Sequence, residues 1–234
     1  MASDVLSYTL EGNTAVVRMD DGKANALSEV MIDSLLEALA RAEKEAGAMV
    51  LTGRPDRFCA GFDLRVMMSS PDAAKALLSR GSDLLMKLYD AQVPLIIACT
   101  GHALAGGALV LLTGDVRIGA EGPYRIGLNE VSIGMPVPVL AMELARDRLA
   151  PTELTHATLL ARIYGPSEAA KAGYLDSTAA ADAVLDLAKA EAARLAGLGR
   201  APFVATKKRL REKTIAHIRA TLADDMKSLM TPTA

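Results

Sequence analysis

The stretch that decides the fold runs from Val93 to Pro138 and reads VPLIIACTGHALAGGALVLLTGDVRIGAEGPYRIGLNEVSIGMPVP. No formally charged residue lies between Asp90 and Asp115, and the pair Gly106-Gly107 sits near the middle of that gap. An apolar run, a glycine turn and a second apolar run predict a buried strand, exposed backbone N–H groups and a buried helix. We expect the N-terminus of this helix to face a ligand.

Past this helix, Glu130 is an isolated carboxylate in an otherwise uncharged run from Ile126 to Glu143. Burial disfavours the charged form of an acid, so it raises the pKa of the carboxyl group towards that of a general base. The alternative interpretation is a structural acid that pairs with Arg125 or Arg146.

The amino-acid composition indicates a folded globular protein and argues against nucleic-acid binding. The 234 residues allow one large domain or two small ones, and 51% of them are hydrophobic, so a folded core is expected. Aromatic residues make up only 3% and the net charge is −2, which argues against a stacking surface and against nucleic acid. A solvated helix face, rather than a phosphate site, is predicted for the clustered basic residues Lys207, Lys208, Arg209, Arg211 and Lys213.

The two cysteines, Cys59 and Cys99, form neither a disulfide framework nor a metal-ligand pattern, and we interpret both as reduced, small apolar residues. No metal site is predicted. Asp4 and Glu11 stand where a signal peptide needs an apolar run, so a cytoplasmic protein is expected.

The uncharged run from Ala91 to Gly114 is long enough to cross a bilayer. Pro94 and the glycines within the run, together with the lack of a second such segment, favour a soluble strand-turn-helix instead.

The N-terminal part predicts two strands, a helix and a third strand. Residues 5–10 and 14–19 are β-rich runs joined by a turn signal, which indicates a hairpin. Ser28 is typical of a helix N-cap, and apolar residues at helical spacing continue to about residue 46. The next apolar run, 49–52, completes a strand-helix-strand order that favours a parallel βαβ unit.

The middle of the chain continues this alternation. A helix is predicted from Ser70-Pro71 to about Tyr89, and strands at 94–100 and 116–118 flank a glycine turn at 101–107.

The C-terminal part is helical by composition. Helices are predicted at residues 140–149, 152–161, 167–173, 181–196 and 203–230, with a break in the last near Lys213-Thr214. We expect an α/β core over residues 1–200 and a helical segment over 201–234. That segment is predicted to pack on a neighbouring subunit through Met226, Leu229 and Met230.

A second informative loop, GRPDRFCAGFDL, spans residues 53–64. Its small residues and glycine let a ligand approach the backbone closely, although an ordinary turn into a helix fits the same letters. The segments FCAGF and ALAGG can each offer an N–H to one oxygen, while Glu130 supplies a base. These are the parts needed to enolise a carbonyl compound.

Four motifs in this order and spacing are similar to those of the crotonase (enoyl-CoA hydratase/isomerase) superfamily. They are KANAL at 23–27, FCAGFDL at 58–64, GHALAGG at 101–107 and GLNE at 127–130, with Asp115 between the last two. The resemblance covers nearly the whole chain. It implies a spiral of ββα units, a homotrimer or a hexamer built as a dimer of trimers, and an acyl-CoA thioester substrate. It implies no cofactor beyond the CoA of the substrate.

The resemblance also implies roles for individual residues. The backbone amides of Phe62 and Gly106 would form the oxyanion hole, and Glu130 would be the catalytic acid/base. Arg65 stands where some members place a basic residue near the CoA nucleotide. The substrate-binding positions implied by the family motifs, and by their surroundings, are Ala24, Ala26, Ala60, Gly61, Asp63, Leu64, Arg65, Leu109, Asn129 and Met135.

One departure from the family pattern bears on the reaction. Hydratases of this family carry two glutamates, but here the first position is Leu109 and only the second, Glu130, is kept. A single glutamate resembles Δ3,Δ2-enoyl-CoA isomerases, which we prefer. The alternatives are an enoyl-CoA hydratase (lyase) of fatty-acid oxidation and a non-catalytic CoA-binding homologue. A dinucleotide-binding domain is disfavoured because GHALAGG lacks the G-x-G-x-x-G spacing.

Overall fold

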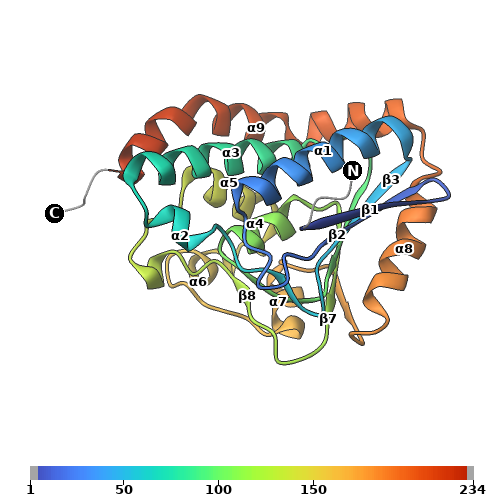
Figure 1. The fold of residues 1–234 in the computed structure, drawn as a ribbon, viewed down its shortest axis with the longest axis horizontal. Helices are drawn as coiled ribbons and strands as arrows, with labels where there is room; N and C mark the ends of the chain where they lie inside the picture. Colours follow the sequence, from blue (N-terminus) through green and yellow to red (C-terminus); the bar gives the residue numbers. More distant parts are fainter. Residues whose placement is uncertain (1–4, 231–234) are drawn as a thin grey trace.

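The chain repeats a unit of two strands followed by helix (Figure 1). The computed structural model describes residues 5–230, and side chains as far as residue 228. The repeating part comprises β1 (Leu6–Glu11), β2 (Thr14–Met19), α1 (Glu29–Glu45), β3 (Ala48–Thr52), β4 (Asp56–Cys59), α2 (Leu64–Met67), α3 (Pro71–Tyr89), β5 (Leu95–Cys99), β6 (Gly101–Leu104), α4 (Gly106–Thr113), β7 (Val116–Ala120), β8 (Ile126–Gly127), the 3₁₀ turn η1 (Val131–Ile133) and α5 (Val139–Arg148). It is followed by α6 (Leu154–Ala157), α7 (Pro166–Ala172), β9 (Ser177–Ala179), α8 (Val184–Leu195) and α9 (Arg200–Met230).

The larger sheet has six strands in the order β1-β2-β3-β5-β7-β9. β1 and β2 form the predicted antiparallel hairpin, and the remaining neighbours are parallel. Val50 and Ile96 on one face pack with α8, whereas Leu51 and Ile97 on the other face belong to the main core with α1 and α3. Because both faces of β3 and β5 are covered, every residue of these two strands is buried, and β5 has no polar side, as predicted.

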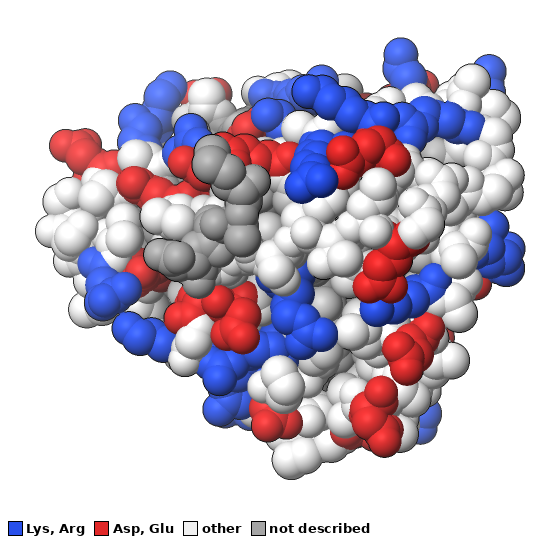
Figure 2. Space-filling model, turned by 45° about the vertical axis from the view of Figure 1, so that its right-hand side comes forward, with Lys and Arg blue, Asp and Glu red and all other residues white. Residues whose placement is uncertain are grey.

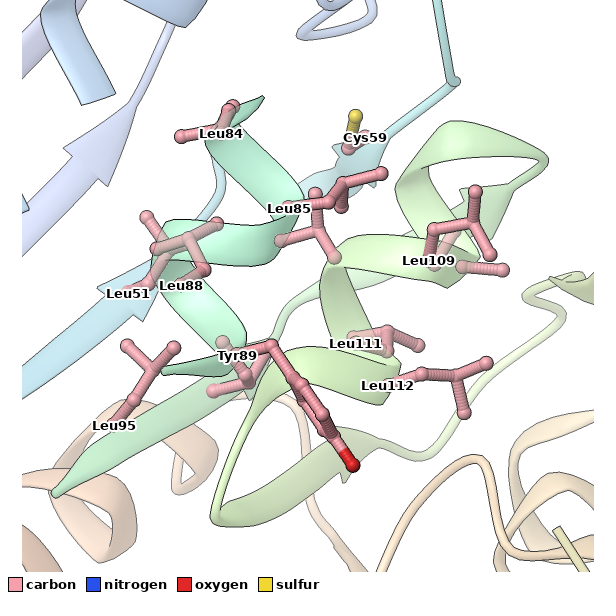
Figure 3. Close-up of a cluster of buried hydrophobic side chains, with 14 of the residues drawn as sticks. Leu51, Cys59, Leu84, Leu85, Leu88, Tyr89, Leu95, Leu109, Leu111 and Leu112 are labelled. Atoms are coloured by element: carbon pink, nitrogen blue, oxygen red, sulfur yellow. The ribbon is translucent and has the colours of Figure 1, made fainter. Parts of the chain in front are cut away.

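The centre of the main core is built by α3 and α4 (Figure 3). Leu84 and Leu88 of α3 lie on the side of Leu51 and Leu95, and Leu85 lies between the two helices. The leucines of α4 belong to the same core cluster. Every residue of α4 is buried, which explains why this helix lacks a polar face. None of the helices described in residues 5–230 is long and apolar enough to cross a bilayer.

The smaller sheet is parallel, with the order β4-β6-β8. This sheet differs from the prediction, because residues 56–59 form β4 instead of part of a loop and residues 101–104 form β6 instead of part of a turn. From the second repeat onward, the first strand of each unit joins the larger sheet and the second joins the smaller one.

Helix boundaries largely follow the sequence signals. Ser28 and Ser70 both cap their helices, since their side chains accept hydrogen bonds from the N–H groups of Met31 and Ala73. The helix predicted at 152–161 is wrong in extent, because α6 spans only Leu154–Ala157.

The break predicted near Lys213-Thr214 is also wrong, since α9 is one continuous helix. Ile215 and Ile218 lie immediately after the expected break and are buried, so packing overrides the weak helix propensity of Thr214.

The basic cluster of α9 corrects another expectation. Lys207 and Arg211 are buried, and both pair with Asp115, at 2.8 Å and 2.9 Å. They are therefore not part of a solvated helix face, whereas Lys208, Arg209 and Lys213 are exposed as predicted. Burial is the main cause that lowers the pKa of Lys207 to about 8. On the face of the molecule in Figure 2, basic and acidic side chains are interspersed, in keeping with the small net charge.

Met226, which was expected to contact a neighbouring subunit, is 7% exposed and packs within its own chain. The side chains of Leu229 and Met230 lie outside the described residues. The trimer or hexamer stays a prediction, as does the division of the chain at residue 200.

Candidate active site

Three loops leave the carboxyl ends of the three strands of the smaller sheet. Phe62 follows β4, Gly106 follows β6, and Glu130 follows β8. The strands are parallel neighbours, with Cys59 opposite Ala103, so their carboxyl ends lie at one edge of the sheet. The topology thus carries the predicted oxyanion donors and the predicted base to the same edge.

The first two loops are in close contact. Gly61 has φ +95°, and a Cβ added there would lie 3.2 Å from the Gly106 nitrogen and 3.1 Å from the Ala105 Cβ. Ala105, just before α4, has φ 48°, a conformation that is uncommon for a residue with a side chain. Within residues 5–230, no hydrogen bond links the N–H of Phe62 or Gly106 to another group. Both N–H groups therefore lack a hydrogen-bond partner among the described residues.

The loop containing Ala24 and Ala26 runs beside the loop that follows β4. Ala60 N–H donates to the Ala24 carbonyl at 3.1 Å, and Leu27 N–H donates to the Gly61 carbonyl at 2.8 Å. The predicted substrate-binding positions at 24, 26 and 60–64 are thereby brought together.

Asn25 holds this arrangement, a role that the sequence analysis did not assign to it. Its side chain is fully buried and its Nδ2 donates to the carbonyls of Met19, Arg57 and Phe58 at 3.1–3.2 Å. Its backbone has φ 53°. Asparagine tolerates this conformation better than most residues, and its place in a polar turn was the available signal.

Glu130 is 7% exposed, and its Oε2 is buried with no hydrogen-bond partner in the described chain. Burial is the main cause that raises the pKa of its carboxyl group, opposed by its own backbone N–H. The alternative of a structural ion pair is wrong for residues 5–230: Arg146 pairs with Glu143 at 3.2 Å, and no cation pairs with Glu130.

Two neighbours complete the surroundings of Glu130. Met135 N–H donates to the Glu130 carbonyl at 2.9 Å, which closes the turn around η1. The Oδ1 of Asn129 is also buried without a partner among the described residues. The chain described here therefore supplies no hydrogen-bond partner to either of these two acceptors, which belong to consecutive residues.

Leu109 and the Phe62 ring line a small apolar cavity of about 30 Å³, which is walled by α3, α5 and α9. The other lining residues are Leu78, Ser82, Leu85, Pro138, Leu140, Leu222, Asp225 and Met226. Leu109 is 4% exposed, so the position implied for a first glutamate is occupied by a buried apolar side chain.

Asp63, Leu64 and Arg65 lie at the start of α2. Asp63 accepts the Arg65 N–H at 2.9 Å as the helix N-cap and pairs with the Arg65 side chain at 3.2 Å. The hydrogen bond from the Arg65 side chain is the main cause that lowers the pKa of Asp63. Leu64 is 64% exposed, so this segment presents an apolar and a basic side chain to solvent.

Other reactive side chains have surroundings that differ from those of Glu130. Cys59 and Cys99 are free and buried, as predicted, and burial raises the pKa of each thiol to about 12. His102 Nδ1 accepts the Arg125 N–H at 3.0 Å. Residues 5–230 contain no group of three or more His, Cys, Asp or Glu side chains that could hold a metal ion.

The raised pKa of Glu130 predicts a pH-dependent stability difference. A carboxyl group whose pKa is higher in the folded state binds more protons when folded, so the free energy of unfolding falls as pH rises through that range. Glutamine does not titrate, so the free energy of unfolding of Glu130→Gln does not fall with pH for this reason. We expect the variant to be at least as stable as wild type at pH 7 in urea unfolding, with the difference shrinking towards pH 4. If the variant were less stable than wild type at pH 7, the raised pKa assigned to Glu130 would be contradicted.

The comparison with known proteins agrees with this geometry. The family model described as enoyl-CoA hydratase/isomerase matches residues 9–233. The chain belongs to the enoyl-CoA hydratase/isomerase family. An enoyl-CoA hydratase/isomerase family protein from Pseudomonas syringae superposes with a TM-score of 0.94 at 37% identity, covering 97% of this chain and 98% of that one. The predicted α/β crotonase fold is thereby confirmed.

Relatives within the enoyl-CoA hydratase/isomerase family carry both activity names. Human mitochondrial enoyl-CoA delta isomerase 1 is 31% identical over 167 residues, covering 69% of this chain. A candidate enoyl-CoA hydratase from Thermus thermophilus is 33% identical over 193 residues, covering 80% of this chain and 76% of that protein. The match to the human isomerase spans 55% of its length.

Proposed function

We propose that this protein isomerises 3-enoyl-CoA to 2-enoyl-CoA thioesters. The Phe62 and Gly106 amides hold the thioester oxygen, and Glu130 is the acid/base. The observation that carries the proposal is the contrast between two buried positions. Glu130 has an unpaired carboxylate oxygen, whereas Leu109 supplies no second carboxylate.

The reaction needs one base and one oxyanion site. Glu130 removes a proton from C2 of the 3-enoyl thioester, and the electron pair delocalises over C2 to C4 and the thioester oxygen. Two N–H donors stabilise that oxygen as it becomes negative, each by about 2.7–4 kcal/mol if correctly placed. The protonated carboxyl group then returns the proton at C4, which leaves the double bond between C2 and C3.

The surroundings of Glu130 suit this role. A raised pKa favours proton abstraction near neutral pH, because a base is most effective when its pKa lies near the working pH. We further propose that the thioester lies between the 24–27 and 60–65 loops, and that its acyl chain points towards Leu109 and Met135. The 30 Å³ cavity lined by Leu109 has room for about one water, so we expect its side chains to move when an acyl chain enters it.

Hydration of a 2-enoyl thioester is the second candidate, and Asn129 is the observation in its favour. Its buried Oδ1 lacks a partner in the described chain and could hold a water beside Glu130. Hydration also requires proton transfer both at the water and at carbon. In this protein a single carboxylate, aided by Asn129, would have to serve both.

A panel of thioesters separates these candidates. Purified protein is assayed with 3-enoyl-CoA and 2-enoyl-CoA esters of four to twelve carbons, and products are resolved by chromatography. Isomerisation of 3-enoyl esters at least tenfold faster than hydration of 2-enoyl esters is the expected result. Comparable rates would favour the hydratase. Calorimetric binding of the thioesters without turnover of either series would indicate a non-catalytic CoA-binding protein.

A further inference from the structure

Gly81 occupies the middle of α3, where glycine is a poor choice. The helix spans Pro71–Tyr89, and Gly81 is buried on its inner face. Glycine inside a helix is destabilising relative to alanine, so a glycine at such a place needs a packing reason.

The reason is the ring of Phe62. A Cβ added at Gly81 would lie 2.1 Å from Cε1 and 2.5 Å from Cζ of that ring, far inside van der Waals contact. On the other edge of the ring, a Cβ added at Gly106 would lie 3.1 Å from Cδ2 and Cε2. The ring therefore lies between two residues without side chains, one on α3 and one at the start of α4.

The same ring belongs to the residue whose amide is a proposed oxyanion donor, and Gly106 carries the other donor. The backbone on both sides of Phe62 is held by Leu27, which donates to the Gly61 carbonyl at 2.8 Å and accepts the Asp63 N–H at 3.3 Å. A ring pushed away from α3 has to move towards Gly106. We expect such a shift to strain the Leu27 hydrogen bonds and so to change the spacing of the two amides.

We propose that Gly81 is a positioning residue for the oxyanion hole: the space that it leaves on α3 seats the Phe62 ring and so sets the distance between the Phe62 and Gly106 amides. The proposal rests on the function proposed above. Gly81 itself touches no substrate.

The test combines Gly81→Ala with Phe62→Leu. Leucine ends at its δ carbons, and the corresponding Cδ1 of Phe62 is 3.4 Å from the added Cβ, an ordinary contact. The clash is thus confined to ring atoms that leucine lacks. Gly165→Ala is the matched control, because a Cβ added there meets nothing within 4 Å and its φ is −74°.

Two measurements are made on wild type, each single variant and the double variant, after circular dichroism has confirmed that each is folded. The first is kcat and KM with a 3-enoyl-CoA ester. The second is the infrared C=O stretching frequency of bound butyryl-CoA labelled with ¹³C at the thioester carbon, which reports hydrogen bonding to that oxygen without requiring turnover.

Gly81→Ala is expected to lower kcat by about 10²-fold, comparable with losing one oxyanion donor, with little change in KM. The carbonyl frequency should move towards its value in water. In the Phe62→Leu background, Gly81→Ala should change kcat less than threefold and leave the carbonyl frequency unaltered. Gly165→Ala in the wild-type background should behave in the same way.

The positioning role would be overturned if Gly81→Ala lowered kcat equally in the wild-type and Phe62→Leu backgrounds. It would also be overturned if the folded Gly81→Ala protein kept the wild-type kcat and carbonyl frequency. A wild type that shifts the carbonyl frequency but turns over no enoyl thioester would refute the proposed function alone. If butyryl-CoA fails to bind wild type, both proposals fall.

Discussion

Glu130→Gln is expected to lower kcat for 3-enoyl-CoA isomerisation by about 10²–10⁴-fold, with KM nearly unchanged. Glutamine keeps the shape of the side chain but cannot take up the C2 proton, so binding survives while proton transfer is lost. The carboxylate has no cation partner in the described chain, so its removal breaks no ion pair. Steady-state kinetics on the folded variant measures the effect.

Glu121→Gln provides the matched control, because Glu121 is exposed and only its backbone N–H makes a hydrogen bond within residues 5–230. It should retain wild-type kcat. The wild-type profile of kcat/KM against pH should also show an acid limb above the usual glutamate range, because burial raises the pKa of Glu130. A Glu130→Gln variant that keeps more than a tenth of wild-type kcat would remove Glu130 from the role of base.

Asp115→Asn is expected to lower the free energy of unfolding by about 3–5 kcal/mol, the usual cost of removing one partner from a buried ion pair. Its carboxylate accepts hydrogen bonds from Lys207 and Arg211 and from the Leu95 N–H. The side chains of both cations are no more than 5% exposed, so the loss of the carboxylate leaves two buried positive charges without their counter-ion. Urea unfolding followed by circular dichroism measures the change.

The control is Asp83→Asn, which breaks the exposed pair of Asp83 and Lys87 on α3. Exposed pairs four residues apart on a helix contribute about 0.3–0.5 kcal/mol to the free energy of unfolding, so Asp83→Asn should have only a small effect. Lys207→Met should also be milder than Asp115→Asn, because Asp115 keeps Arg211 as a partner. If Asp115→Asn costs no more than Asp83→Asn, the network does not anchor α9.

Local signals predicted the elements that depend on local physics. The N-caps at Ser28 and Ser70, the first hairpin and the uncharged strand at 95–99 all follow from nearby residues, and the structure confirms them. The smaller sheet escaped prediction because its strands are two to four residues long and pair with segments distant in the chain. β4 also begins with the charged pair Asp56-Arg57, so no alternating pattern marks it.

The sequence indicated the individual loops and residues of the candidate site, but not how the fold brings them together. The glycine loops and the lone Glu130 stood out in the sequence, and the family resemblance supplied their roles. That all three follow neighbouring strands of one sheet depends on pairings such as Leu104 with Gly127, which no local pattern specifies. Gly81 lies on a helix remote from every motif, and its contact with Phe62 arises only when α3 packs against the loop.

The anchoring of α9 also has a consequence for biosynthesis. Asp115 leaves the ribosome long before its cations, which follow 92 and 96 residues later in the chain. At about 5–20 residues per second, Asp115 is synthesised several seconds before either of its cations. We therefore expect α9 to dock on the rest of the fold only after residue 211 has been synthesised, and this docking neutralises the charge of Asp115.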